Sequence, residues 1–236
     1  YLVEVAEILI GISNDWYEKN TSWAFLSILR KAGRSNRFSD RPFYQPEELT
    51  RLIVELLDAQ KGSVYNPYAG LCSFGASISS NCRYYAQELS IDYVLGKFNL
   101  LLHNKRNAVC EKEDSQIKWK GALGFDYIVS SPPFGVRCNS QYRATARDYL
   151  FRSAMNARHK AIGVYPSSIC FDSGLSSSRV SKLVEDDCIE SVILLANKTF
   201  QHTGIEPVII VVNKNKKQKK AIRFVDASDS FDTTRR

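Results

Sequence analysis

The feature that most constrains this chain is an apolar strand that runs into two prolines, at residues 125–135 (FDYIVSSPPFG). Proline fixes its own φ, lacks a backbone N–H and pushes the preceding residue into extended conformation. Ser131 is therefore expected at a rigid strand end, where its hydroxyl and the Pro132 carbonyl accept from a planar amine while Phe134 stacks on its ring. The pattern predicts a site for an amino-bearing base turned out of a nucleic-acid helix. The alternative is an ordinary strand-to-loop turn closed by prolines.

Composition restricts the class of protein without deciding its function. The 236 residues are 44% hydrophobic and 24% charged, which fits a globular α/β domain. No stretch reaches the apolar length of a membrane span, so no membrane partner is expected. None of the six cysteines forms a C-x-x-C pair, so we expect no metal site, and reduced thiols in the cytoplasm are the default. The net charge of +7 suits a polyanionic partner, but many basic proteins bind none.

A second pattern, at residues 63–88, is typical of nucleotide-binding proteins. A short strand at 63–67 precedes a loop that contains Gly70 and Gly75, and glycine lets the backbone approach a ligand. A second strand, at 84–88, ends in Glu88. An acid about 20 residues after a glycine loop can bind the two hydroxyls of a ribose. Glu88 is alternatively an acid at a helix N-terminus, and the two roles are compatible.

Further candidate residues lie at the ends of predicted elements. Pro46 suits the first turn of a helix, and Tyr44 before it is placed either to stack on a purine or to pack on that helix. Asp114, in a polar loop after a third strand, is a candidate to meet a cofactor base or a substrate amine; the alternative is a solvated acid. A series of arginines after the proline turn is placed to hold phosphates or to form a solvated helix face: Arg137, Arg143, Arg147 and Arg152.

The remaining strand signals favour a sheet buried on both faces. Uninterrupted apolar runs occupy residues 161–166, 191–196 and 207–213. No long helix separates the last two runs, so they are expected to pair as an antiparallel hairpin. The pattern predicts a Rossmann-like α/β fold of about seven strands, mostly parallel, with an antiparallel C-terminal hairpin. Residues 214–220 form a basic loop, which we take as a candidate contact for DNA.

Seven short motifs occur in series: FYQP at 43–46, VYNPYAG at 64–70, AQE at 86–88, NLLLH at 99–103, SPPFG at 131–135, FQHTGI at 200–205 and IRFVDAS at 222–228. They resemble motifs of the amino-methylating DNA methyltransferases, in particular the modification subunit of type I restriction–modification systems. The family patterns are, in the same order, F-Y-T-P, V-Y-D-P-x-x-G, G-Q-E, N-L-L-L-H, N-P-P-F-G, F-x-x-T-G-I and a strand ending I-D-A-S. The resemblance covers about residues 40–230.

This resemblance implies a chemistry and a set of residues. It implies methyl transfer from S-adenosylmethionine to N6 of adenine in DNA, by a methyltransferase catalytic domain at 41–236 behind an N-terminal helical segment at 1–40. The implied partners are DNA, a specificity subunit and a restriction subunit. The implied catalytic residues are Ser131, Pro132, Pro133 and Phe134. The implied cofactor-binding residues are Tyr44, Gln45, Pro46, Asn66, Tyr68, Gly70, Glu88 and Asp114.

Three positions depart from the family pattern. The acid of the first motif is Asn66 here, its Gly-Ser-Gly is Gly70-Leu71-Cys72, and the asparagine before the two prolines is Ser131. A Ser-Pro-Pro turn is typical of cytosine-N4 methyltransferases, which share the fold. Three alternatives therefore stay open: a cytosine-N4 enzyme, a methyltransferase acting on RNA or a protein glutamine, and a degenerate subunit that keeps the fold to bind DNA or protein.

Overall fold

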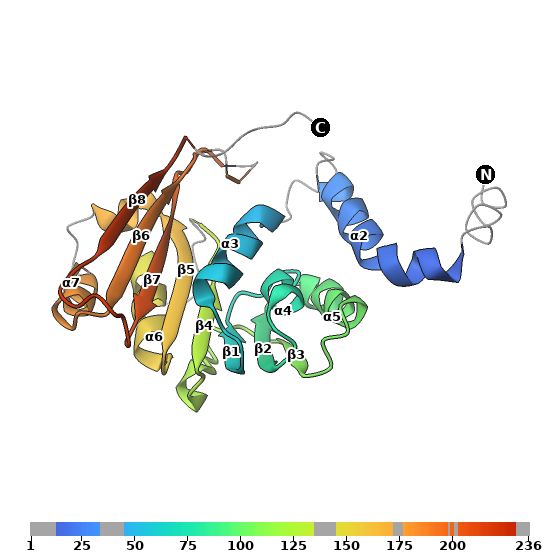
Figure 1. Ribbon diagram of the computed structural model, residues 1–236, viewed down its shortest axis with the longest axis horizontal. Helices are drawn as coiled ribbons and strands as arrows, with labels where there is room; N and C mark the ends of the chain where they lie inside the picture. Colours follow the sequence, from blue (N-terminus) through green and yellow to red (C-terminus); the bar gives the residue numbers. More distant parts are fainter. Residues whose placement is uncertain are drawn as a thin grey trace.

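The computed structural model describes residues 13–33, 45–134, 145–171, 177–197, 199–200 and 203–229. Within these ranges eight strands form one sheet in the order β3-β2-β1-β4-β5-β7-β6-β8 (Figure 1). The strands are β1 Gly62–Asn66, β2 Cys82–Glu88, β3 Ala108–Lys112, β4 Tyr127–Ser130, β5 Lys160–Pro166, β6 Ile189–Leu195, β7 Pro207–Asn213 and β8 Arg223–Ala227. The predicted Rossmann-like α/β fold is confirmed.

Strand direction follows the prediction, but the strand count does not. Strands β1 to β5 are mutually parallel, and β7 lies antiparallel between β5 and β6. The predicted antiparallel hairpin of β6 and β7 is thereby confirmed. The expected number of about seven is too low, because the described residues form eight strands; the strand expected at the 222–228 motif is observed as β8, at the edge of the sheet and parallel to β6. Four of its five residues are exposed, so β8 lacks the apolar run that marks a buried strand.

Helices cover both faces of the sheet. The described helices are α2 Asn14–Gly33, α3 Glu47–Leu57, α4 Ser73–Ser77, α5 Asp92–Leu102, α6 Ala146–Asn156 and α7 Ser177–Glu185, with short 3-10 helices at Gly121–Leu123 and Ser167–Cys170. Successive side chains of a strand point to opposite faces. On β1, Val64 accordingly joins the core under α3, α4 and α5, whereas Tyr65 joins the core against α6 and α7. The prediction of strands buried on both faces is confirmed for β7, whose first six residues are all buried.

Helix α2 extends along the α5 side of the sheet (Figure 1). Its Phe25 packs edge-on against Phe98 of α5, with the ring centroids 5.0 Å apart. Helix α2 lies within the segment 1–40 that was expected to be helical, of which only residues 13–33 are described, and the division into an N-terminal segment and a catalytic domain stays a prediction. No helix within the described ranges combines the length and apolar character needed to cross a membrane.

Candidate cofactor and active site

The carboxyl ends of the parallel strands bring most of the predicted site residues to one edge of the sheet. β1 ends at Asn66, β2 at Glu88 and β4 at Ser130, next to the proline turn. In open α/β sheets, ligands bind at this edge, where the strand order reverses. Here the order reverses between β1 and β4, so the loops after these two strands form the candidate site.

The glycine loop after β1 is attached to the end of β2. The Gly70 N–H donates to Glu88 Oε2 over 2.7 Å, and the Ala69 N–H donates to the Gln87 carbonyl over 3.0 Å. The other Glu88 oxygen, Oε1, accepts from the Ser90 N–H at 2.8 Å, just before α5. Glu88 therefore lies against the glycine loop and also closes the turn that leads into the helix. Its half-exposed carboxylate keeps lone pairs for further donors.

Gly70 supplies the conformation and the space that a ligand needs. Its φ is +50°, in the left-handed region that favours glycine. A Cβ built on Gly70 would meet no other atom within 4 Å, so the loop is open on that side. Together with the neighbouring carboxylate of Glu88, this open backbone suits a ligand that carries a ribose and a charged amino acid portion.

Asn66, expected to contact the cofactor, is instead completely buried beneath the loop. Its Oδ1 accepts from the Tyr68 N–H at 3.1 Å, and its Nδ2 donates to the Tyr84 hydroxyl at 2.9 Å. An amide can satisfy both partners at once, whereas a buried carboxylate would carry a large desolvation cost. Direct contact between Asn66 and a ligand is therefore not supported, and the residue shapes the loop from below.

Two further predicted residues flank the loop. Tyr68 packs edge-on against Tyr149 of α6, with centroids 5.2 Å apart, and burial raises the pKa of its phenol well above the ordinary value. Asp114 follows β3, where its Oδ1 accepts from the Gln116 N–H at 2.8 Å. The preceding Glu113 N–H donates to the Glu88 carbonyl, so Asp114 lies at the strand end next to Glu88.

The residues before α3 are only partly described. Tyr44 lies outside the described residues. Gln45 turns its side chain onto the helix, where Nε2 donates to Thr50 Oγ1 at 2.8 Å. Pro46 is the N-cap of α3, one position before the first turn in which it was expected, and its carbonyl accepts from the Thr50 N–H. Gln45 and Pro46 thus begin a helix, and their predicted contact with a cofactor stays a prediction.

The proline turn after β4 is supported by a loop distant in sequence. Phe134 packs edge-on against the buried Phe200, with centroids 5.5 Å apart and an angle of 85° between the ring planes. Behind the turn, the Ser130 and Tyr165 hydroxyls lie 3.4 Å apart, both fully buried. Burial raises the pKa of Tyr165 to about 12. Ser131 is half-buried and Pro132 buried. The orientation of Phe134 therefore depends on the connection between β6 and β7.

The described arginines after the turn, Arg147 and Arg152, have contacts within the fold. Arg147 is 4% exposed, and its guanidinium donates to the Ile169 carbonyl at 3.1 and 3.3 Å. Arg152 lies over the Trp119 ring, 4.8 Å from its centroid. Both interpretations, phosphate contact and solvated face, are therefore wrong for Arg147, because its guanidinium is buried and bonded within the fold. Arg152 is half-buried, and for this residue both interpretations stay predictions. Arg137 and Arg143 lie outside the described residues.

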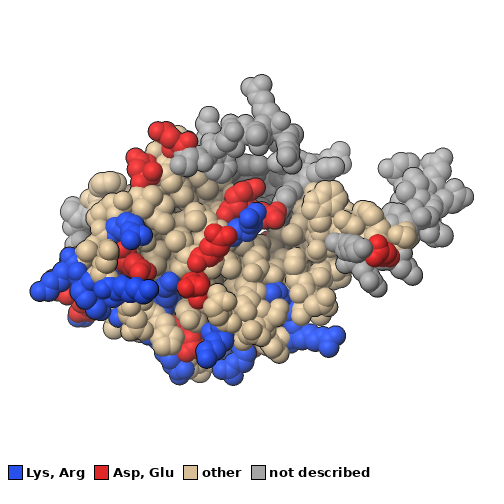
Figure 2. All heavy atoms as spheres, in the orientation of Figure 1, with Lys and Arg blue, Asp and Glu red and all other residues tan. Residues whose placement is uncertain are grey.

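The basic loop at residues 214–220 lies at the opposite edge of the sheet. β7 is antiparallel to β5 and pairs Asn213 with Lys160, the first residue of β5. Lys and Arg side chains gather where Figure 1 shows the connection between β7 and β8, whereas acidic side chains lie over α3 (Figure 2). The loop is therefore not placed to hold a DNA strand whose base enters the candidate site.

One lysine of this loop is structural. Lys216 is 3% exposed, and its ammonium donates to the Ile189 carbonyl at 3.0 Å and the Ala221 carbonyl at 2.8 Å. It also pairs with Asp187, whose carboxylate accepts from the Lys220 N–H. The Lys216 ammonium holds the pKa of Asp187 below its ordinary value. Lys216 thus ties the loop to the start of β6.

We expect Lys216→Met to lower the thermal midpoint of unfolding by several degrees, because it leaves two carbonyls without their donor, at about 1–3 kcal/mol for an unsatisfied buried group. Lys217→Met, at the exposed neighbouring lysine, is the matched control. The pKa of the Asp187 carboxyl is lower in the folded chain than its ordinary value of about 4, so the charged carboxylate stabilises the fold at pH values above about 4. This stabilisation is lost as the pH falls through the pKa of the folded state. The difference in thermal midpoint between the wild type and Lys216→Met should therefore be smaller at acidic pH. Equal midpoints in both variants at pH 7 would contradict this role.

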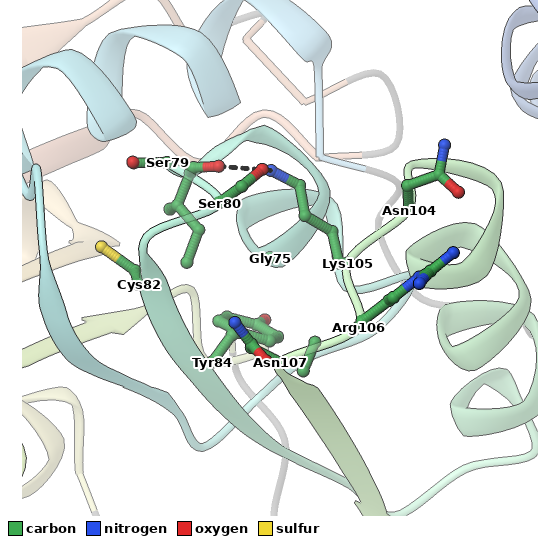
Figure 3. A pocket seen from close by; sticks show the side chains of 11 residues that line it. Gly75, Ser79, Ser80, Cys82, Tyr84, Asn104, Lys105, Arg106 and Asn107 are labelled. Atoms are coloured by element: carbon green, nitrogen blue, oxygen red, sulfur yellow. Dashed lines mark hydrogen bonds between the residues drawn. The ribbon is translucent and has the colours of Figure 1, made fainter.

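A hollow of about 150 Å³ at the same opposite edge does not suit the cofactor. It is lined by residues at the start of β2 and β3, among them Tyr84 and Asn107 (Figure 3). Ligand pockets for drug-sized molecules measure about 300–1,000 Å³. The Lys105 ammonium is already bonded to the Ile78 carbonyl and lies 3.5 Å from Ser80 Oγ. The described ranges also contain no group of three His, Cys, Asp or Glu side chains able to hold a metal ion.

Comparison with known proteins finds related sequences and related structures. The sequence model of the N-6 DNA methylase family matches residues 24–236. The chain belongs to the N-6 DNA methylase family. It is 28% identical to the type I restriction enzyme MjaVII methylase subunit of Methanocaldococcus jannaschii, covering 80% of this chain and 39% of that protein. It is 23% identical to the MpnII methylase subunit of Mycoplasma pneumoniae, covering 97% of this chain and 51% of that protein.

Solved structures show the same fold. The methyltransferase subunit of a type I restriction–modification system from Streptococcus thermophilus superposes with a TM-score of 0.72 at 20% identity, covering 81% of this chain and 49% of that one. The chain thus spans about half the length, or less, of these three proteins.

Two residues of α5 contact the glycine loop, and the sequence analysis gave neither a role: Asn99 appears there only as the first residue of the NLLLH motif, and Gly96 was missed. Asn99 Nδ2 donates to the Leu71 carbonyl at 2.8 Å, and Gly96 faces Cys72 and the Gly70 carbonyl. Glycine and asparagine are both less favourable than alanine inside a helix, so their presence in the middle of α5 is the signal that would have pointed to a packing role.

Proposed function

We propose that this chain transfers a methyl group from S-adenosylmethionine to the exocyclic N6 of adenine in DNA, as part of a restriction–modification system. The observation that carries the proposal is the hydrogen bond between Glu88 and Gly70, which joins an acid to an open glycine loop beside the turn at 131–134. Methyl transfer requires a cofactor and a target held side by side, and the glycine loop and the proline turn, which we propose as their two sites, follow neighbouring strands at the same edge of the sheet. Membership of the N-6 DNA methylase family favours adenine.

The residues present fit S-adenosylmethionine. Glu88 would accept from the ribose hydroxyls, and the backbone of residues 69–72 would hold the methionine portion. Asp114, at the neighbouring strand end, would accept from the adenine amine. When bound, the cofactor supplies an electrophilic methyl group on a sulfonium. Asn66 and Tyr84 act only from below, by holding the loop in its open shape.

The proline turn would bind the target base. Ser131 Oγ and the Pro132 carbonyl would accept hydrogen bonds from the exocyclic amine, while Phe134 stacks on the ring. The lone pair of such an amine is delocalised into the ring, which makes it a poor nucleophile. Two acceptors aimed at its hydrogens localise the lone pair on nitrogen, so positioning and charge placement supply most of the catalysis.

The test is calorimetry with S-adenosylmethionine, followed by mass spectrometry of nucleosides from DNA incubated with the chain, a specificity subunit and labelled cofactor. We expect cofactor binding and label in N6-methyladenine. Label in N4-methylcytosine would overturn the base assignment. Cytosine is the alternative base because Ser131 stands where the family has asparagine, and a Ser-Pro-Pro turn is typical of cytosine-N4 methyltransferases. A folded chain that neither binds the cofactor nor transfers label would favour the degenerate-subunit alternative.

We expect Ser131→Ala to lower the rate of methyl transfer about tenfold, because it removes one acceptor from the amine. Ser131→Asn should keep or raise the rate, since an amide oxygen supplies the same acceptor on a longer side chain. Ser80→Ala, at an exposed serine of the opposite edge, is the matched control. A Ser131→Ala variant as active as the control would remove the hydroxyl from the mechanism.

We further propose that a specificity subunit reads the DNA sequence and that a restriction subunit joins the complex in the cytoplasm. The curated relatives are type I methylase subunits, which supports this arrangement. Arg147 and Arg152 are used within the fold, so we expect the chain alone to bind DNA weakly and in a salt-sensitive manner. Tight discrimination between two unrelated duplexes by this chain alone would contradict the proposal.

A further inference from the structure

We propose that Asn99 and Gly96 of α5 are positioning residues for the cofactor loop, which we define as residues 69–72. Neither residue is proposed to touch the cofactor. Both fix the backbone that holds its methionine portion, so this inference rests on the proposed function. The argument depends on three observations: the burial of Asn99, the close approach of α5 at Gly96, and the left-handed residues of the loop.

Asn99 is buried to 1% exposure on the inner face of α5. Its Nδ2 donates to the Leu71 carbonyl at 2.8 Å, while Oδ1 has no hydrogen-bond partner within the described part of the chain. A buried amide is costly unless it forms hydrogen bonds, and an apolar side chain would pack here without that cost. The contact with the cofactor loop is therefore what the asparagine contributes at this position.

Gly96 lets α5 approach the loop. A Cβ built on Gly96 would lie 2.8 Å from Cys72 Sγ and 2.9 Å from the Gly70 carbonyl oxygen. Real Cβ atoms essentially never come this close to other atoms, and the second neighbour is backbone that must move. Glycine is unfavourable inside a helix relative to alanine, so close packing explains its presence. The loop and α5 are thus in contact over one full helical turn, from Gly96 to Asn99.

The loop needs this support because its conformation is costly. Gly70 and Cys72 both have left-handed φ values, +50° and +55°. A non-glycine residue such as Cys72 keeps this conformation only when the surrounding structure determines it. Glu88 holds the Gly70 N–H from β2, and Asn99 holds the Leu71 carbonyl from α5. The two contacts fix consecutive residues of the loop from different elements, which keeps it shaped for the ligand before binding.

The test compares two ligands by calorimetry on the folded chain. S-adenosylmethionine carries the amino acid portion that the loop would hold, whereas 5′-methylthioadenosine lacks it. We expect Asn99→Ala to weaken S-adenosylmethionine binding about tenfold and 5′-methylthioadenosine binding less than twofold. Asn156→Ala is the matched control, because that amide donates over the same 2.8 Å to a carbonyl within α6, away from the loop. It should leave both affinities unchanged.

Gly96→Ala provides a second variant that favours helix formation and is therefore expected to fold. It should show the same ligand-selective loss, because its new methyl group displaces the loop. Equal losses for both ligands, or affinities within twofold of wild type in both variants, would overturn the inference. A folded wild-type chain that binds neither ligand would overturn the proposed function instead, so the two failures are distinguishable.

Discussion

Glu88→Ala is expected to lower the affinity for S-adenosylmethionine about a hundredfold while the chain stays folded. The variant removes the acceptor proposed for two ribose hydroxyls, and a hydrogen bond to a charged group contributes about 1.5–3 kcal/mol. It also frees the Gly70 N–H, which Glu88 Oε2 holds at 2.7 Å, so the loop loses one of its supports. Calorimetry measures the affinity, and a thermal unfolding transition checks the fold.

Two further variants separate these effects. Glu88→Gln keeps an acceptor for the Gly70 N–H but removes the charge, so its loss should be smaller than that of the alanine variant. Glu190→Ala is the matched control, since Glu190 is a half-buried strand residue that accepts from Asn213 Nδ2 at 3.1 Å near the opposite edge. Wild-type affinity in Glu88→Ala, together with an intact transition, would remove Glu88 from the cofactor site.

Phe134→Ala is expected to reduce methyl transfer about a hundredfold while leaving cofactor affinity within about twofold. Stacking of a base on an aromatic side chain contributes about 1–3 kcal/mol, and the ring also sets where the amine lies relative to Ser131. Single-turnover rates with saturating cofactor measure this step. Phe134→Tyr keeps the ring and should retain most of the activity.

The contact with Phe200 provides a graded comparison. Phe200→Ala leaves the stacking ring in place but removes the neighbour that orients it, 5.5 Å away, so its rate should fall less than that of Phe134→Ala. Phe224→Ala, on the exposed edge strand β8, is the control and should transfer methyl groups at the wild-type rate. If Phe134→Ala lost cofactor affinity and rate in parallel, Phe134 would belong to the cofactor site rather than to the base site.

The sequence alone determined the fold class and the edge of the sheet where the candidate site lies. Uninterrupted apolar runs predict buried strands, and these indicate the fold class. In a parallel sheet the loop after each strand begins at that strand's carboxyl end, so the loops that carry the candidate residues lie at one edge. Gly70 and Glu88 could therefore be paired from their spacing, and the structure brings them within hydrogen-bond distance. The motif at 131–134 needed no tertiary information either, because prolines fix the backbone locally.

Side-chain partners that are distant in sequence depended on the tertiary structure. Arg147 has the charge of a phosphate ligand, but burial against the Ile169 carbonyl decides its role. Asn66 occupies a motif position and lies under the loop, bonded to Tyr84 on the adjacent strand. Lys216 is one of several lysines in its loop, yet it is buried. Nothing in the local sequence distinguishes these residues, because burial arises from elements that meet only in the folded chain.

The position of the basic loop at 214–220 shows the same dependence at the level of topology. Its charge was evident from the sequence, and so was the antiparallel hairpin of β6 and β7. The order of strands in the sheet decided where this loop lies. β7 pairs with β5 in antiparallel direction, so the loop after β7 begins beside Lys160, at the start of β5. An antiparallel strand delivers its next loop to the edge opposite the carboxyl ends of its parallel neighbours. Sequence supplied the charges, and strand direction within the sheet placed them away from the candidate site.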